Sequence, residues 1–226
     1  MCSSSCFILV SQDHGYSQGQ FRLDSHKMQV YDHGVRVPAL LRGPGVTPGT
    51  NVALPTSMVD VAPTLLELAA GADAVPSSMD GRSLAPLVVA PGDTTAPGTK
   101  QTAAEHRAAV VASWRDAVLI EYQSIAQAGL GPGRMRHPVD GVNNTFRALR
   151  ILNTTHNMLY AEFTDVSKAE DWDFPDASLN FFELYNVTED RFMLHNVYAM
   201  ADAKLKDALH SQLKEMFHCK GQAECR

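Results

Sequence analysis

The chain begins with a short apolar run that is followed at once by a polar turn. Phe7–Val10 has the length and composition of a β-strand, and the polar residues Ser11–Tyr16 come directly after it. A buried parallel strand needs a neighbour on each side, and few further parallel strands can be read downstream. We therefore expect an α/β sheet of which this chain carries only a part, truncated at its front.

Two regions of different character follow this strand. The first contains a second predicted strand, Val35–Leu41, and a helix over Asp60–Ala70 with Asp60 as its N-cap. Residues 88–104 are rich in Pro, Gly and Thr, which is typical of a surface linker. We expect two domains, residues 1–95 and residues 96–226.

The second region is predicted to be an α+β domain with an antiparallel sheet and a long terminal helix. Turn signals separate five short predicted strands: Ala109–Ser113, Ala117–Tyr122, Phe146–Leu152, Met158–Phe163 and Phe182–Tyr185. The tail over Ala199–Phe217 carries apolar residues at helical spacing, which we interpret as core packing.

Charge and hydropathy exclude two classes of function. The 226 residues contain 19 Lys and Arg against 25 Asp and Glu, a net charge of −6, so no nucleic-acid partner is expected. No apolar run approaches the ~20 residues that cross a bilayer, so no membrane span is expected. With 45% apolar residues, the chain can bury a core.

Cysteines and glycosylation motifs suggest an oxidising, secretory history. Cys219 and Cys225 flank a polar loop long enough to close a small disulfide ring. Asn143, Asn153 and Asn186 each begin an Asn-x-Thr motif, the acceptor for N-glycosylation, although such short motifs also occur by chance. No signal peptide is visible, because residues 1–6 carry no positive charge and the apolar run after them is short.

The turn after the first strand is the best place for a functional site. Ligands of open α/β sheets bind at the carboxyl ends of strands, where Asp13 and His14 stand. A carboxylate beside an imidazole could hold a hard divalent cation, or the pair could simply form a turn. Lys27 follows 14 residues after Asp13 and could pair with an anionic substrate group or be an ordinary solvated lysine.

A family resemblance goes further than these residues alone. Asp-His-Gly-Tyr-Ser-Gln-Gly-Gln-Phe at residues 13–21 resembles the Asp-Asn/His-Gly-Tyr-x-x-Gly-Gln-Phe segment of the sulfatase family. The resemblance continues in the same order through Lys27, Tyr31, Arg36–Pro38, Arg42–Gly45, Val59–Ala69 and Met79–Leu84. The tail, with Phe182–Asp190 and Cys219–Cys225, is most similar to the N-acetylglucosamine-6-sulfatase branch.

This resemblance implies an alkaline-phosphatase-like core and a sulfate-ester site. In the family a formylglycine attacks the sulfate ester while a calcium ion polarises the sulfate oxygens. By resemblance, Asp13 and His14 are calcium ligands and Lys27 contacts the sulfate. The implied substrate is a sulfated sugar or glycosaminoglycan, and the implied location is lysosomal or secreted.

The chain also departs from the family pattern. The motif that is converted to formylglycine, Cys/Ser-x-Pro/Ala-x-Arg, does not occur in the 226 residues, and the paired early aspartates are absent as well. Asp32-His33-Gly34 stands where relatives carry an acidic or aliphatic trio, which changes the support around Lys27. We expect the chain alone to be inactive toward sulfate esters.

Three functions remain open. The first is a sulfuric ester hydrolase of the glucosamine-6-sulfatase type. The second is a non-catalytic glycan-binding or interaction module, served by basic clusters at Arg134–His137 and Arg147–Arg150. The third is another hydrolase of the same superfamily, such as a phosphodiesterase or phosphonate monoester hydrolase.

Overall fold

The computed structural model describes residues 6–23, 25–89, 103–124, 141–168 and 174–225, which fall into two compact units. The first unit comprises Met1–Asp13, Pro38–Val118 and Glu215–Arg226. The second comprises His14–Val37 and Leu119–Lys214. The predicted domain boundary after residue 95 lies outside the described residues and stays a prediction.

The first unit contains a two-stranded sheet. Strand β1 (Ile8–Ser11) pairs antiparallel with β2 (Ala39–Arg42), with Leu9 opposite Leu41. The predicted first strand is therefore confirmed, but its expected parallel pairing is wrong for the described residues. The side chains of Val10 and Leu40 stay exposed, so this strand pair lacks the two-sided burial that parallel sheets require.

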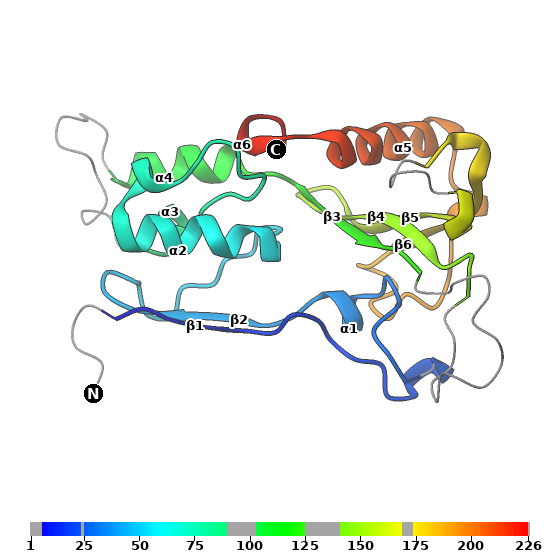
Figure 1. Ribbon diagram of the computed structural model, residues 1–226, viewed down its shortest axis with the longest axis horizontal. Helices are drawn as coiled ribbons and strands as arrows, with labels where there is room; N and C mark the ends of the chain where they lie inside the picture. Colours follow the sequence, from blue (N-terminus) through cyan, green and yellow to red (C-terminus); the bar gives the residue numbers. More distant parts are fainter. Residues whose placement is uncertain (1–5, 24, 90–102, 125–140, 169–173, 226) are drawn as a thin grey trace. The chain divides into compact units, whose positions relative to one another are not determined.

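Helices make up most of the rest of the first unit (Figure 1). They are α2 (Val61–Ala70), α3 (Ala85–Val88), α4 (Ala103–Ala112) and α6 (Gly221–Glu224), with 3₁₀ turns at Met58–Asp60 and Ala72–Ala74. Helix α2 confirms the predicted helix almost to the residue. Helix α4 overturns the predicted strand Ala109–Ser113. Five of its ten residues are alanine, the best helix former, and this outweighs the local β preference of Val110 and Val111.

Asp60 occupies the predicted N-cap position of α2, but its side chain makes no cap hydrogen bond to that helix and instead forms a polar centre of the first unit. Its fully buried carboxylate accepts hydrogen bonds from the backbone N–H groups of Ser57 and Arg82, both at 2.8 Å. It also forms an ion pair with the buried guanidinium of Arg115. The carboxylate thus closes the turn before α2 and joins it to two distant segments.

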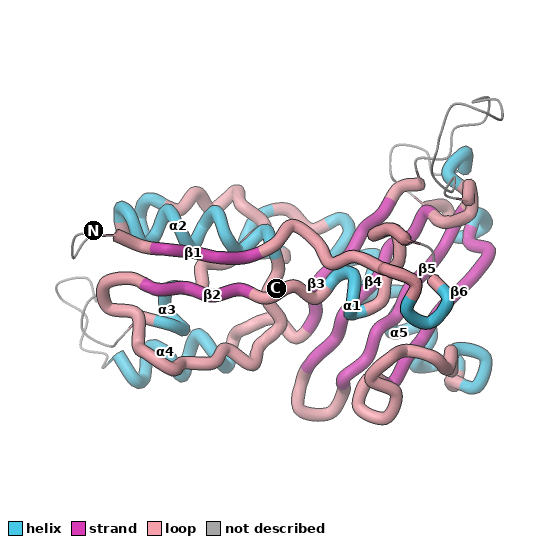
Figure 2. Tube along the Cα trace, turned by 90° about the horizontal axis from the view of Figure 1, so that it is seen from below, coloured by secondary structure: helices cyan, strands magenta, loops and turns pink. Residues whose placement is uncertain are grey.

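The second unit is built on a sheet of order β3-β4-β5-β6 (Figure 2). The strands are β3 (Ala117–Tyr122), β4 (Thr145–Leu152), β5 (Asn157–Thr164) and β6 (Leu179–Asn186), and β4, β5 and β6 pair antiparallel. The predicted antiparallel sheet is confirmed, and each observed strand contains or matches a predicted one. The turns Val166–Lys168, Asp176–Ser178 and Tyr198–Met200 are 3₁₀.

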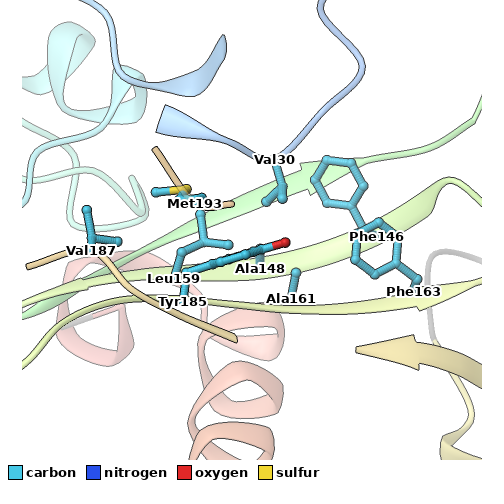
Figure 3. Close-up of a cluster of buried hydrophobic side chains, with 9 residues drawn as sticks. All are labelled: Val30, Phe146, Ala148, Leu159, Ala161, Phe163, Tyr185, Val187 and Met193. Carbon is cyan, nitrogen blue, oxygen red and sulfur yellow. The ribbon is translucent and has the colours of Figure 1, made fainter. Parts of the chain in front are cut away.

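One face of this sheet carries the apolar core of the unit. Figure 3 shows Val30 and Met193 lying over Leu159, Ala148 and Ala161 of the central strands. Phe146, Phe163, Tyr185 and Val187 complete the cluster. Because Val30 belongs to the segment His14–Val37, this core fixes that segment to the sheet. The segment contains the 3₁₀ turn Gln20–Arg22 and the short helix α1 (Asp32–Val35).

The predicted terminal helix is confirmed as α5 (Ala203–His218). In the second unit, His210 of this helix contacts the buried Glu162 of β5, with 2.6 Å between Nδ1 and Oε1. Leu209 and Leu213 are buried, in agreement with the predicted packing stripe. None of the helices in the described part of the chain combines the length and apolar character that a membrane crossing requires.

We predict that Asp60→Ala lowers the free energy of unfolding by about 3–5 kcal/mol, because it leaves the buried Arg115 charge uncompensated. Urea denaturation measures this loss. Asp73→Ala is the matched control, since Asp73 is exposed, and its effect should stay within about 0.5 kcal/mol. Equal stability of the two variants would contradict the role given to Asp60.

Candidate functional site

The segment His14–Val37 folds back on itself and is held by backbone hydrogen bonds. The N–H of Gly15 donates to the carbonyl of Gly34 at 2.8 Å, and the N–H of Ser17 donates to the carbonyl of His26 at 2.7 Å. A Cβ atom on Gly15 would stand 2.2 Å from the carbonyl oxygen of His33, so only glycine permits this approach. The fold therefore brings both ends of the segment to one place.

The segment brings His14 and Lys27 into direct contact. Lys27 Nζ lies 2.5 Å from His14 Nε2, and His14 Nδ1 lies 2.7 Å from the carbonyl oxygen of Gly15. An ammonium group can only donate, so Nε2 accepts and Nδ1 carries the proton that binds Gly15. The contact fixes the ammonium while its other N–H groups remain donors for an anion. These are two of the three predicted site residues.

The third predicted residue, Asp13, is the last residue of the first segment of the first unit. It is exposed and follows β1 by two positions. Within the described residues no group of three or more His, Cys, Asp or Glu side chains could hold a metal ion. Calcium needs six to eight oxygen ligands, and both ring nitrogens of His14 are already engaged. The described donor set does not by itself fit calcium, so no step below passes through a metal.

Asp32 and His33 support the segment in a way that the sequence did not reveal. Asp32 pairs with Arg150 of β4, with 2.9 Å between Oδ1 and Nε, and both side chains are largely buried. His33 stacks on Tyr31 and lies 3.1 Å from the Ser17 hydroxyl through Nε2. Burial lowers the pKa of His33, which favours its neutral form. Asp32 and His33, at which the chain departs from the family pattern, therefore hold the segment in place rather than act as ligands.

A hydrogen bond between Tyr31 and Glu183 joins this segment to the sheet. The Tyr31 hydroxyl donates to Glu183 Oε1 of β6 at 3.3 Å. Burial raises the pKa of Glu183 to about 6, against the lowering effect of hydrogen bonds from Tyr31 and Tyr185. Burial, and then the Glu183 charge, raise the pKa of Tyr31 to about 12, so Tyr31 remains a donor. Glu183 belongs to the tail Phe182–Asp190 of the family resemblance, but no role in a site could be predicted for it from the sequence, because its partner lies 152 positions away in the chain.

The other predicted residues lie on turns and at the chain end. Cys219 and Cys225 form a disulfide in the first unit. Asn143 stands exposed in the turn before β4, Asn153 lies in the turn between β4 and β5, and Asn186 ends β6. Glycosylation of these three residues stays a prediction.

Comparison with known proteins identifies what this chain is similar to. The family model named Sulfatase matches residues 3–72. Human N-acetylglucosamine-6-sulfatase is 29% identical over 235 residues, which cover 99% of this chain and 37% of that protein. The chain thus spans little more than a third of the length of this relative. The family resemblance inferred from the motifs is confirmed.

Solved structures confirm the fold class. A structure from work on glycosaminoglycan metabolism by Bacteroides thetaiotaomicron superposes with a TM-score of 0.58 at 18% identity, covering 92% of this chain and 35% of that one. A phosphonate monoester hydrolase from Silicibacter pomeroyi gives a TM-score of 0.57 at 24% identity, covering 93% and 34%. These likenesses support the alkaline-phosphatase-like α/β fold, and they do not choose between sulfate and phosphonate chemistry.

We predict that Glu183→Gln changes how stability depends on pH. The folded-state pKa of about 6 lies above the ordinary 4.5, so folding binds a proton between these values and wild-type stability falls as pH rises through them. The variant should therefore be more stable than wild type at pH 7 by about 2 kcal/mol, and this advantage should vanish below pH 4.5.

Urea denaturation between pH 4 and pH 8 measures this difference. The matched control is Glu189→Gln, because Glu189 is exposed on the turn after β6, and it should follow the wild-type profile. Parallel profiles for Glu183→Gln and wild type would show that burial does not penalise this carboxylate.

Proposed function

We infer that this chain, a member of the sulfatase family, supplies part of the active site of a sulfuric ester hydrolase. The observation that carries this proposal is the contact between Lys27 and His14, formed within the segment that matches the family model. The contact fixes the ammonium group of the residue that the resemblance assigns to the sulfate contact.

Lys27 acts on the charge of the sulfate group. Its ammonium group binds a sulfate oxygen and stabilises the negative charge that develops on the leaving oxygen as the ester bond breaks. His14 is a positioning residue in this proposal, because its Nε2 fixes one N–H of the ammonium and leaves the others free to turn toward the substrate.

The remaining catalytic groups are expectations from the family. A formylglycine would supply the nucleophile and calcium would supply a Lewis acid. The resemblance assigns Asp13 and His14 to that ion, but both ring nitrogens of His14 are engaged with other groups, so His14 would have to give up one of these contacts to act as a ligand. The role proposed for the Lys27 ammonium group depends neither on the formylglycine nor on the calcium ion.

The proposed substrate is a sulfated sugar of a glycosaminoglycan, of the N-acetylglucosamine 6-sulfate type. This proposal is supported by the similarity to N-acetylglucosamine-6-sulfatase along nearly the whole chain. A secreted or lysosomal location fits the Cys219–Cys225 disulfide and the three glycosylation motifs. One relative, 36% identical over half of this chain, is named an extracellular sulfatase in Drosophila melanogaster.

The alternative, a non-catalytic glycan-binding module, loses one of its two predicted basic clusters. Arg147 is fully buried, and Arg150 forms an ion pair with Asp32. These side chains therefore do not form an exposed cationic patch for a sulfated polymer. The other cluster, Arg134–His137, lies outside the described residues.

We predict that Lys27→Ala removes the preference of the chain for a sulfated sugar. N-acetylglucosamine 6-sulfate should bind the variant about tenfold more weakly than wild type, as expected for the loss of a charge-assisted hydrogen bond. Isothermal titration measures both affinities. Lys204→Ala, at an exposed lysine of α5, is the matched control. Equal affinities of Lys27→Ala and Lys204→Ala would contradict the proposal.

The 226-residue chain itself should not hydrolyse an aryl sulfate, because its sequence contains no motif for the formylglycine nucleophile. A chromogenic aryl sulfate, assayed with calcium and with EDTA, tests this expectation. Turnover that EDTA abolishes would show that another side chain replaces the family nucleophile.

A further inference from the structure

A pocket of about 360 Å³ lies within the second unit, on the same sheet face as the apolar core. Its lining includes four amide side chains, an aromatic ring and a carboxyl group: Gln29, Asn143, Asn144, Asn180, Phe181 and Glu183. We call these six residues and the space they enclose the amide pocket. Its volume is at the lower end of the range of ligand sites and suits a single ring.

One carboxylate oxygen in the lining of the amide pocket is buried and unpaired within the part of the chain that the structure describes. Glu183 Oε1 accepts the hydrogen bond from Tyr31, whereas Oε2 is buried without a hydrogen-bond partner among the described residues. The residue as a whole is 7% exposed. Buried polar atoms are almost always paired, so an unpaired acceptor in the lining of a cavity calls for a donor from a ligand.

The amide groups are arranged by local irregularities of the structure. Asn180 occupies a β-bulge, because Phe163 pairs with Phe181 while Thr164 pairs with Leu179. Bulges redirect side chains and occur often beside functional sites. Asn180 Nδ2 donates to Asn143 Oδ1 at 3.2 Å. That bond leaves the nitrogen of Asn143 as a donor and the oxygen of Asn180 as an acceptor.

The composition of the lining selects a class of ligand. Amide donors and acceptors beside an exposed aromatic face match the alternating hydroxyls and apolar face of a pyranose ring. The Phe181 side chain is 50% exposed and packs against Phe163 at 5.5 Å between ring centroids. None of the described residues that line the pocket is basic, and Glu183 is acidic, so a sulfated or carboxylated sugar is disfavoured.

We propose that the amide pocket binds an uncharged pyranose, such as an N-acetylhexosamine, at a site separate from the His14–Lys27 contact. A sugar hydroxyl donates to Glu183 Oε2, Asn143 Nδ2 donates to a neighbouring hydroxyl, Asn180 Oδ1 accepts from another, and the ring packs on Phe181. The proposal does not rest on sulfate chemistry, since Lys27 is not part of the lining.

The test is the binding of N-acetylglucosamine to the full chain, measured by isothermal titration and by protein NMR. Asn143 is a predicted glycosylation site in the lining, so the protein is produced in an oxidising bacterial host that adds no N-glycan. We expect an affinity in the millimolar range, typical of one small ring, and weaker binding of glucuronate.

Phe181→Ala should weaken N-acetylglucosamine binding at least about threefold, because the ring loses its packing surface. Phe192→Ala is the matched control. Phe192 is equally exposed at 52%, packs on one aromatic ring at 5.5 Å, and is not part of the lining. The control should bind as wild type does, and both variants should keep the wild-type unfolding transition to within about 1 kcal/mol.

Lys27→Ala separates this proposal from the proposed function. Loss of neutral-sugar binding in Phe181→Ala with normal binding in Lys27→Ala supports the amide pocket, whatever happens with the sulfated sugar. No binding of N-acetylglucosamine, equal binding by Phe181→Ala and Phe192→Ala, or loss in Lys27→Ala alone would overturn it. The last outcome would place the sugar at the sulfate site and leave the proposed function standing.

Discussion

The attachment of the segment His14–Val37 to the antiparallel sheet is the constraint on which the site depends. Three consecutive residues make it in three different ways. Val30 is buried in the apolar core, Tyr31 donates to Glu183, and Asp32 pairs with Arg150. His14 and Lys27 are 13 positions apart, and the backbone hydrogen bonds between Ser17 and His26 turn the chain back between them. The contact between their side chains is a consequence of that closure.

This attachment also connects the residues that match the family model to the rest of the chain. The family model ends at residue 72, but the partners of Val30, Tyr31 and Asp32 lie on β4, β5 and β6. The sheet is therefore more than an appended domain, because it supplies the surface against which the site loop folds. A buried ion pair and a hydrogen bond to a buried carboxylate are specific in geometry, which suits them to positioning.

The sequence predicted the regular elements well where local signals decided them. The turn signals that bound β4 and β5 and the helical spacing of apolar residues in α5 are such signals, and the structure contains all three elements. The predicted strand over Ala109–Ser113 was wrong because the helix propensity of the surrounding alanines outweighs the β preference of the two valines. The pairing of β1 was wrong because strand direction depends on partners distant in the chain.

The sequence predicted only those site residues that belong to the family resemblance and have a role in its motif. His14 lies in the family motif at residues 13–21 and Lys27 in the continuation of the resemblance, which assigned both to one site but did not predict their direct contact. Tyr31 and Glu183 are 152 residues apart, and neither the raised pKa of Glu183 nor the bulge at Asn180 has a signature in the sequence. Such features depend on burial, which the sequence specifies only through the whole fold.

The central claim is that the imidazole of His14 fixes the ammonium of Lys27 for a sulfate group. The most direct measurement is the nitrogen NMR spectrum of the His14 ring, with and without N-acetylglucosamine 6-sulfate. A proton on Nδ1 with an accepting Nε2 is expected, with a shift of Nε2 on adding the sulfated sugar but not N-acetylglucosamine. A proton on Nε2 in the free chain, or an identical response to both sugars, would contradict it.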